Sequence, residues 1–162
     1  MIYVTVGTQL PFDRLVRAVD RWAVDRGRDD VFAQIGRTVY RPPHIRWTAF
    51  LTPSQSAECL DEADVIVSHA GTGTIIGALE RRKPIIVVPR QTALGEHRND
   101  HQVATARRFG ARGLVVVAED EQSLCAKLDE ISCIAAGAAN ADIRLGADQT
   151  LIDYLRRLLE DA

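Results

Sequence analysis

Residues 64–89 read as strand, tight turn, helix and strand, an order typical of α/β folds. The first apolar run ends in Ser-His-Ala, a Gly-Thr-Gly-Thr segment covers residues 71–74, and Pro84-Ile-Ile-Val-Val-Pro supplies the second run. Gly71 and Gly73 lack a Cβ, so a ligand can approach the backbone closely there. A helix beginning near Thr74 would direct free N–H groups and the positive end of its dipole into the turn. Such a turn attracts an anion, and phosphate is the usual one.

The rest of the chain continues this alternation. Most expected strands are uniformly apolar, which indicates a sheet covered on both faces and therefore mostly parallel. We predict one α/β domain with a doubly wound, mostly parallel Rossmann-like sheet over residues 1–134, and a linker with a C-terminal helix over 135–162. The expected strands are 2–6, 31–35, 44–51, 64–67, 85–88 and 114–117; the expected helices are 12–26, 54–60, one beginning near Thr74, 99–109, 121–134 and, after a small-residue linker at 135–141, 148–159.

Composition favours a cytoplasmic protein. Apolar residues make up 46% of the 162 positions and charged residues 26%, which is ordinary for a soluble domain. No apolar run approaches the roughly 20 residues of a membrane span, and the stretch after Met1 lacks the basic start of a signal peptide. Cys59, Cys125 and Cys133 are widely spaced, so we expect reduced thiols rather than a disulfide or a zinc site.

Charge is segregated along the chain. Residues 81–112 hold eight Arg or Lys and two acids, whereas residues 113–162 hold four basic and ten acidic side chains. Two interpretations stay open: a mixed solvated surface, or a basic region that faces a sugar nucleotide, a lipid diphosphate or a membrane. Nucleic acid is disfavoured, because no aromatic residues are interleaved with the basic block.

The polar loops point to one edge of the sheet. Ligands of parallel sheets bind beyond the carboxyl ends of the strands, where the strand order reverses. The loops expected there are 7–11, 36–42, 68–73 and 89–102. The turn at 68–74 is either a phosphate cradle or a turn whose glycines serve packing alone, and His69 either donates to a phosphate or sits in the core. It matches neither the P-loop nor the dinucleotide fingerprint.

A second polar segment, Glu96-His-Arg-Asn-Asp-His-Gln102, leads into a helix. Its paired donors and acceptors suit sugar hydroxyls, although a solvated helix cap is the plainer alternative. His97 and His101 have a spacing that can bind zinc, but the nearby Asn and Gln are poor zinc ligands. No Ser-His-Asp or cysteine-nucleophile signature is present, so direct displacement between bound partners is favoured over covalent catalysis.

Three motifs together resemble the donor-binding, C-terminal half of GT-B glycosyltransferases: Val65–Thr74, Lys83–Arg90 and Glu96–Gln102. The start Ile2-Tyr-Val-Thr-Val-Gly-Thr8, followed by Phe-Asp-Arg-Leu at 12–15, is similar to the small catalytic subunits of two-chain transferases. These are the cytosolic subunit of the dolichol-linked GlcNAc transferase and the PssE-type subunits of bacterial exopolysaccharide synthesis, with glycosyltransferase family 28 C-terminal domains. The resemblance covers residues 1–117 well and the tail loosely.

The resemblance implies two groups of binding residues. Related enzymes also place a glutamate on the donor ribose at the position of Gly77, and Glu80, one helical turn further on, is expected to replace it. Arg90 and Arg98 can pair with a carboxylate if the sugar is glucuronic acid. The nucleotide and phosphate group is Gly7, Thr8, His69, Gly71, Thr72, Gly73, Thr74 and Glu80; the sugar group is Arg90, Glu96, Arg98, Asn99, His101 and Gln102.

The implied function is that of a UDP-sugar-binding catalytic subunit of a heteromeric hexosyltransferase. It would move a GlcNAc-type or glucuronic-acid-type sugar to a lipid-linked acceptor in polysaccharide synthesis, with inversion of configuration. UDP-sugar is the donor substrate, and no cofactor or metal is expected. A membrane-associated subunit would bind the acceptor, hold the chain at the membrane and supply the general base. No residue of this chain is assigned a catalytic role. The alternatives are a non-catalytic nucleotide-sugar module and, more remotely, an unrelated NAD enzyme.

Overall fold

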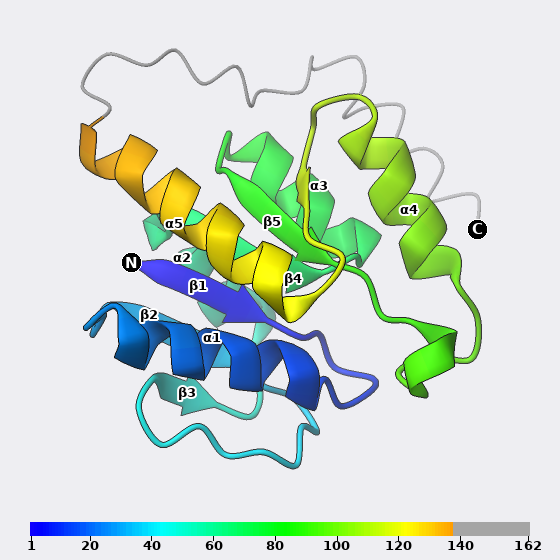
Figure 1. Ribbon diagram of the computed structural model, residues 1–162, viewed down its shortest axis with the longest axis horizontal. Helices are drawn as coiled ribbons and strands as arrows, with labels where there is room; N and C mark the ends of the chain where they lie inside the picture. The colour runs from blue at the N-terminus through cyan, green and yellow to red at the C-terminus, as the bar shows by residue number, and fades with distance from the viewer. Residues whose placement is uncertain (138–162) are drawn as a thin grey trace.

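The computed structural model describes residues 1–137 and contains one six-stranded parallel sheet in the order β3-β2-β1-β4-β5-β6 (Figure 1). The doubly wound, parallel arrangement predicted from the sequence is therefore confirmed. Its strands are β1 (Ile2–Thr5), β2 (Val31–Gln34), β3 (Arg46–Thr48), β4 (Val65–His69), β5 (Ile85–Val88) and β6 (Val116–Val117). Its helices are α1 (Asp13–Asp25), α2 (Pro53–Glu62), α3 (Thr72–Glu80), the 3-10 turn η1 (Thr92–Leu94), α4 (His101–Gly110) and α5 (Glu121–Gly137).

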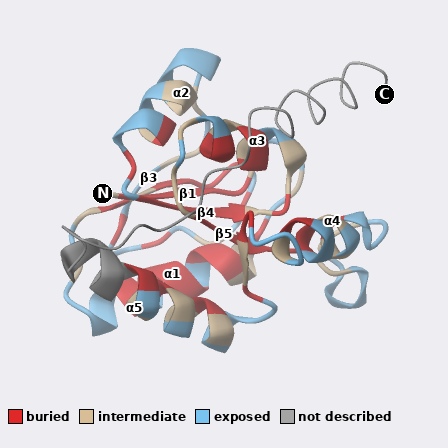
Figure 2. Ribbon diagram, turned by 90° about the horizontal axis from the view of Figure 1, so that it is seen from above, coloured by how far each residue is buried: buried red, intermediate tan, exposed pale blue. Residues whose placement is uncertain are grey.

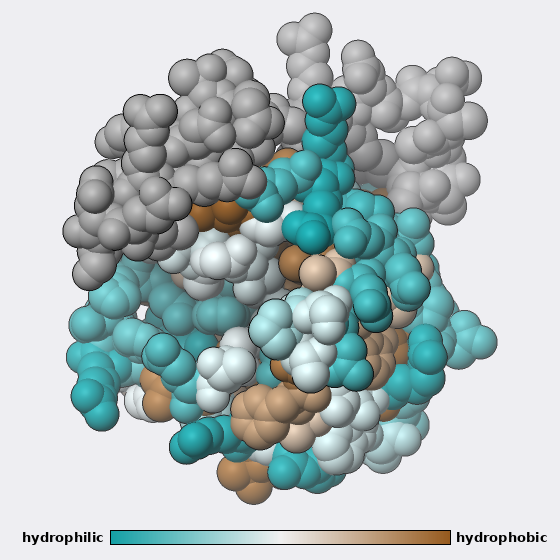
Figure 3. Space-filling model, turned by 180° about the vertical axis from the view of Figure 1, so that it is seen from behind, coloured by the Kyte–Doolittle hydropathy of each residue, from teal (hydrophilic) through white to brown (hydrophobic). Residues whose placement is uncertain are grey.

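The helices cover both faces of the sheet, which explains why the central strands are apolar throughout. Ile2 and Val4 of β1 pack in a core shared with α1 and α5. Tyr3, between them, points into a second core shared with α2, α3 and α4. Figure 2 shows α1 and α5 below the sheet and α2 and α3 above it, with the buried residues concentrated between the layers. The rear face, which carries α2 and α3, mixes hydrophilic residues with apolar areas in its lower half (Figure 3).

The strand order reverses between β1 and β4. These two strands pair in parallel, from Ile2 opposite Val65 to Thr5 opposite Ser68. β2 and β3 extend the sheet to one side of this pair, and β5 and β6 extend it to the other side. The reversal opens a crevice at the carboxyl ends of β1 and β4, which is where ligands bind in open α/β sheets.

Several element boundaries differ from the sequence-based expectation. β4 runs on through His69, and α3 begins at Thr72 rather than near Thr74, so the turn between them is only two residues long. The strand expected over 44–51 is confined to Arg46–Thr48 at the sheet edge. α5 continues to Gly137, because the alanines at the start of the expected linker are strong helix formers. The rest of that linker and the expected helix 148–159 lie outside the described residues.

Cys59 and Cys125 are free, half-buried thiols, and the Cys133 side chain lies outside the described set. In the described part of the chain, no helix combines the length and the apolar character needed to cross a bilayer.

Candidate functional site

A cavity of about 610 Å³ opens at the carboxyl ends of β1 and β4. Its wall contains the Arg90 guanidinium and three histidines but neither Asp nor Glu, so the surroundings favour an anionic ligand. It is lined by Tyr3, Thr5–Leu10, Gln34, Leu51, Ser56, His69–Thr74, Arg90, His97, His101, Gln102 and Thr105.

His69 lies between two glycines that leave room for its ring. A Cβ added to Gly71 would lie 2.3 Å from His69 Nε2, and one added to Gly7 would lie 2.8 Å from Cε1. Real Cβ atoms do not approach that closely, so both positions require glycine while the ring stays in place. Gly7 also has a φ of +74°, a conformation in which a side chain is strained. These glycines therefore leave room for the His69 ring beside the turn that precedes α3.

His69 is a neutral hydrogen-bonding group in this site. Burial and, to a smaller extent, the positive charge of Arg90 lower its pKa from 6.5 to about 4, although a hydrogen bond with the Thr5 backbone opposes the shift. Its Nδ1 lies 3.3 Å from Ser68 Oγ. A neutral imidazole carries one N–H donor, so His69 can hydrogen-bond a phosphate oxygen at neutral pH.

The amino end of α3 is open towards the cavity. Gly71 is the N-cap, has extended backbone and makes no side-chain capping bond. The first bond within the helix runs from Ile75 N–H to Gly71 O at 3.1 Å, so the N–H groups of residues 72–74 precede the helical ladder. These groups and the helix dipole form an anion site of the type predicted from the Gly-Thr-Gly-Thr segment.

The first loop, residues 7–10, is fixed by Gln34 and Arg90. Gln34, which is 4% exposed, donates through Nε2 to Gly7 O at 3.1 Å and to Ala49 O at 2.9 Å. Arg90 Nη2 donates to Val6 O at 2.9 Å and to Leu10 O at 2.6 Å. The loop is therefore tied to β2 and to the segment that follows β5, and it does not rely on a ligand for its shape.

Arg90 is a buried cation at the cavity wall. It is 3% exposed, its guanidinium lies 4.8 Å from the centre of the Phe12 ring, and its Nε has no hydrogen-bond partner. Burial lowers its pKa from 12.5 to about 10, against the raising effect of Glu96, so it stays charged at neutral pH. Arg90 N–H donates to Gln102 Oε1 at 3.1 Å, which turns the side-chain amide of Gln102 towards β5.

The structure brings together ten of the fourteen residues assigned to the site from the sequence. The ten that line the cavity are Gly7, Thr8, His69, Gly71, Thr72, Gly73, Thr74, Arg90, His101 and Gln102. Glu80, Glu96, Arg98 and Asn99 are not in the lining. Glu96 instead pairs with Arg14, and Glu80 lies beside Arg81 at 4.0 Å. Their roles in binding stay predictions.

Gly77 has a packing reason to be glycine. A Cβ added there would lie 3.2 Å from Leu60 Cδ1, so this position faces α2 and allows the two helices to approach. Ribose binding by Glu80 in place of a glutamate at 77 also stays a prediction.

Sequence reasoning missed several residues of the cavity wall, of which Gln34 is the most informative. A buried glutamine that ends an otherwise apolar strand was a usable signal, since buried polar side chains carry hydrogen bonds that shape nearby loops. Its Oε1 accepts from Thr5 Oγ1 at 2.7 Å, which joins the ends of β1 and β2.

His97, considered for zinc with His101, lines the cavity with its ring centre 5.4 Å from that of His101. Among the side chains that the structure describes, no three potential ligands from His, Cys, Asp and Glu are grouped to hold a metal.

Comparison with known proteins places this geometry in a family. The family model "Glycosyltransferase family 28 C-terminal domain" matches residues 1–141. The UDP-N-acetylglucosamine transferase subunit ALG13 of Mus musculus is 32% identical over 121 residues, which is 68% of this chain and 10% of the mouse protein. The chain thus spans about a tenth of the length of that relative.

Solved structures show the same fold. The solution structure of ALG13 has a TM-score of 0.60 at 21% identity, with 95% of this chain and 94% of that chain covered. MurG of Acinetobacter baumannii has a TM-score of 0.56 at 17% identity and covers 96% of this chain, which corresponds to 49% of MurG. The fold is therefore that of one half of a GT-B glycosyltransferase, as the sequence motifs predicted.

Proposed function

Because the chain belongs to the glycosyltransferase family 28 C-terminal domain family, we propose that it binds the UDP-sugar donor of a two-subunit glycosyltransferase. Residues 7–10, His69 and residues 71–74 hold the diphosphate, and Arg90, His101 and Gln102 contact the sugar. In this proposal the donor is a hexose nucleotide of the GlcNAc or glucuronic acid type. The mouse relative is named as a UDP-N-acetylglucosamine transferase subunit, which supports the first of these.

The observation that carries the proposal is the electrostatic character of the cavity. An uncapped helix end, a neutral imidazole and a buried guanidinium line a wall without carboxylates. A diphosphate is a dianion or trianion at neutral pH, and each of these groups donates hydrogen bonds or positive potential to it. A neutral ligand would bring no negative charge to these groups.

The proposed reaction is a direct displacement at the anomeric carbon. The acceptor hydroxyl attacks, the bond to the UDP oxygen breaks, and the sugar configuration inverts. Negative charge develops on the leaving diphosphate, where the N–H groups of residues 72–74 and His69 are already oriented to receive it, so no reorganisation is needed during the reaction. The base that takes the acceptor proton comes from the partner subunit, in keeping with a cavity wall that offers no carboxylate.

A partner is part of the proposal because the mouse relative is named as a subunit of its transferase. The partner subunit is membrane-associated, binds a lipid-linked acceptor for polysaccharide synthesis and keeps this chain at the cytoplasmic face of the membrane. A reading frame that encodes such a protein next to this one would supply the subunit for testing.

The test has a binding arm and a transfer arm. UDP is titrated into the full-length chain while backbone amide signals are followed by NMR; we expect the largest changes at residues 7–10, 69–74 and 101–105. Transfer from UDP-GlcNAc and UDP-glucuronic acid to a polyprenyl-diphosphate acceptor is then measured for the chain alone and with the partner. Transfer by the pair alone supports the proposal, whereas UDP changes centred on another part of the surface would refute it.

A non-catalytic nucleotide-sugar module is the second candidate, and Gly77 favours it. This position faces Leu60 and offers no carboxylate to a ribose. UDP-sugar binding at the same cavity, with no transfer in any pairing, would select this candidate over the first.

A further inference from the structure

The segment that joins β5 to α4, residues 89–100, is called the strap here. It carries His97 into the cavity wall and leads into His101 and Gln102 at the start of α4. Its two acids, Glu96 and Asp100, are both absent from the cavity lining. Asp100 accepts a hydrogen bond from Thr92 N–H at 2.9 Å, so this carboxylate closes the strap on itself. The other carboxylate has a more distant partner.

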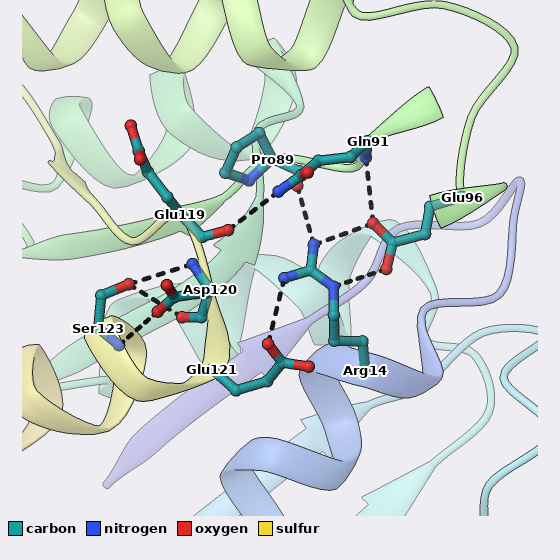
Figure 4. Close-up of polar contacts among 8 residues, drawn as sticks. All are labelled: Arg14, Pro89, Gln91, Glu96, Glu119, Asp120, Glu121 and Ser123. Atoms are coloured by element: carbon teal, nitrogen blue, oxygen red, sulfur yellow. Dashed lines mark hydrogen bonds and ion pairs between the residues drawn. The ribbon is translucent and has the colours of Figure 1, made fainter. Parts of the chain in front are cut away.

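Glu96 forms a two-point ion pair with Arg14 of α1. Arg14 Nε lies 2.7 Å from Glu96 Oε1, and Arg14 Nη2 lies 2.9 Å from Oε2 (Figure 4). The two side chains are 12% and 11% exposed. Burial disfavours the charge of Arg14, but the hydrogen bond and charge of Glu96 outweigh it and raise the pKa of Arg14. Parallel N–H···O bonds of this kind fix orientation as well as distance.

The same ion pair holds the backbone of the strap. Arg14 Nη2 also donates to Pro89 O at 3.2 Å, and Gln91 N–H donates to Glu96 Oε2 at 3.0 Å. On the other side, Gln91 Nε2 donates to Glu119 O at 3.0 Å, and Glu121 at the start of α5 lies 3.8 Å from Arg14 Nη1. In Figure 4, Pro89 and Glu96 of the strap and Glu121 of α5 contact Arg14, and Gln91 reaches Glu96 on one side and Glu119 on the other. Removing Arg14 would therefore free Pro89 and Glu96, the two points at which Arg14 holds the first half of the strap.

We propose that Arg14 and Glu96 are positioning residues that order the strap before the donor binds, so that His97, His101 and Gln102 meet the sugar in a preformed arrangement. The proposal rests on the proposed function for the identity of the ligand. Glu96 thereby acts on the sugar through the strap rather than by touching it. A site that is competent for only about a tenth of the time shows a roughly tenfold weaker apparent affinity.

A merely structural ion pair would behave differently. Loss of general stability weakens every ligand alike, since it lowers the fraction of folded chain. Loss of order in residues 91–98 leaves the buried Arg90 side chain in place. It therefore spares the diphosphate groups at residues 7–10 and 69–74, which belong to other elements. The ratio of the affinities for UDP-GlcNAc and UDP therefore separates the two roles.

The experiment compares Arg14→Met with Arg21→Met in the full-length chain. Methionine keeps an apolar stem beside Phe12, whose ring lies 5.4 Å from Arg14 Cζ. Arg21 is exposed on the same helix, so its substitution controls for the loss of one positive charge from α1. Hydrogen exchange of the free chain is the first readout: we expect amides of residues 91–98 to exchange roughly tenfold faster in Arg14→Met, with β1 and β4 unchanged.

Calorimetry with UDP and UDP-GlcNAc is the second readout. We expect Arg14→Met to weaken UDP-GlcNAc binding roughly tenfold and UDP binding less than twofold, and Arg21→Met to change neither. Arg14→Lys restores the charge without the two-point geometry and should recover part of both effects. Uniformly faster exchange, an unchanged affinity ratio, or a Lys variant no better than Met would overturn the proposal. If the unmodified chain binds neither ligand, the proposed function fails, and the exchange result still decides whether the ion pair orders the strap.

Discussion

The His69 side chain is half-buried and neutral at pH 7, and this makes its contribution to stability pH-dependent. Its pKa is about 4 in the folded chain and 6.5 in its ordinary state. As the pH falls through 6.5 the unfolded chain takes up a proton that the folded chain refuses until about pH 4. The free energy of unfolding should therefore drop by roughly 3 kcal/mol over this window on account of His69 alone.

The measurement is urea unfolding of the unmodified chain and of His69→Gln between pH 7 and pH 4. Other groups titrate in both proteins and cancel in the difference, so the variant should show the smaller loss. Parallel pH profiles would mean that the folded and unfolded chains protonate His69 at the same pH, and the lowered pKa of His69 would then be wrong.

Gly71 and Gly73 look equivalent in the sequence but not in the structure. A Cβ at Gly71 would meet His69 Nε2 at 2.3 Å, whereas nothing lies within 4 Å of a Cβ at Gly73. We expect Gly71→Ala to lower the free energy of unfolding by roughly 1–3 kcal/mol through overpacking. Gly73→Ala should raise it by roughly 0.5–1 kcal/mol, because glycine disfavours the helix. Denaturant midpoints at pH 7 give both values, and equal midpoints would contradict the predicted packing of the imidazole ring.

At the scale of single residues, the sequence predicts the kind of ligand a site binds better than the contacts between its side chains. The Gly-Thr-Gly-Thr segment indicated an anion site because backbone and glycine properties are local. The partner of Glu96 is 82 residues away in the chain, at Arg14, so no local pattern identifies it. For the same reason Gln34, whose bonds reach Gly7 and Ala49, was not assigned to the site.

Among the elements, α1 organises the chain between β2 and β3 as well as the strap. Asp20 of α1 is 2% exposed, and its Oδ1 accepts from His44 N–H and Ile45 N–H, each at 3.1 Å. Its Oδ2 accepts from Tyr40 O–H at 2.7 Å. Burial would raise the pKa of Asp20, but the bonds from Tyr40 and His44 outweigh it and lower the pKa. One carboxylate thus anchors residues 40–45 to the helix.

Asp20→Asn should lower the free energy of unfolding by roughly 2–4 kcal/mol at pH 7, since buried donors lose a charged acceptor. The depressed pKa means that the stabilisation is present above the ordinary carboxyl pKa of 3.8 and is lost as the pH falls through the lower folded-state value. Urea unfolding measures the effect, with Asp25→Asn, an exposed site on the same helix, as the control. Equal losses in the two variants would show that Asp20 does not anchor the loop.

The elements themselves followed largely from hydrophobic periodicity. Central strands such as β5 are buried on both faces, so their apolar runs were unmistakable and their bounds were predicted correctly. β3 lies at the edge of the sheet, and its three residues are partly or fully exposed. No run of buried apolar residues therefore marks where this strand begins and ends. The short η1 turn was not predicted, because a single turn between polar residues leaves no periodic signal.

At the scale of the whole molecule, the sheet order explains why one cavity collects residues from distant parts of the sequence. β1 and β4 are adjacent and their carboxyl ends point the same way, so the loops after residues 5 and 69 meet. Apart from their glycines, neither loop needs an unusual backbone conformation to do so. β5 is the next strand, so the strap meets them on the β4 side. The sequence predicted this meeting from topology alone, whereas the ties that fix each loop depend on side chains that only the folded chain brings together.

This architecture predicts how ligands stabilise the whole domain. A ligand at a hundred times its Kd adds about 2.7 kcal/mol, which corresponds to a rise in Tm of roughly 5–10 °C for a chain of this size. UDP should produce such a shift because His69 and the amino end of α3 can bind its diphosphate, and the positive charge of Arg90 in the same cavity wall favours an anion. Uridine at the same concentration should give less than a quarter of the shift, since it brings no phosphate to those groups. Differential scanning fluorimetry at fixed ionic strength measures both. An equal shift with uridine would show that the base, and not the diphosphate, carries the affinity, and the assignment of the α3 turn as the phosphate site would then be wrong.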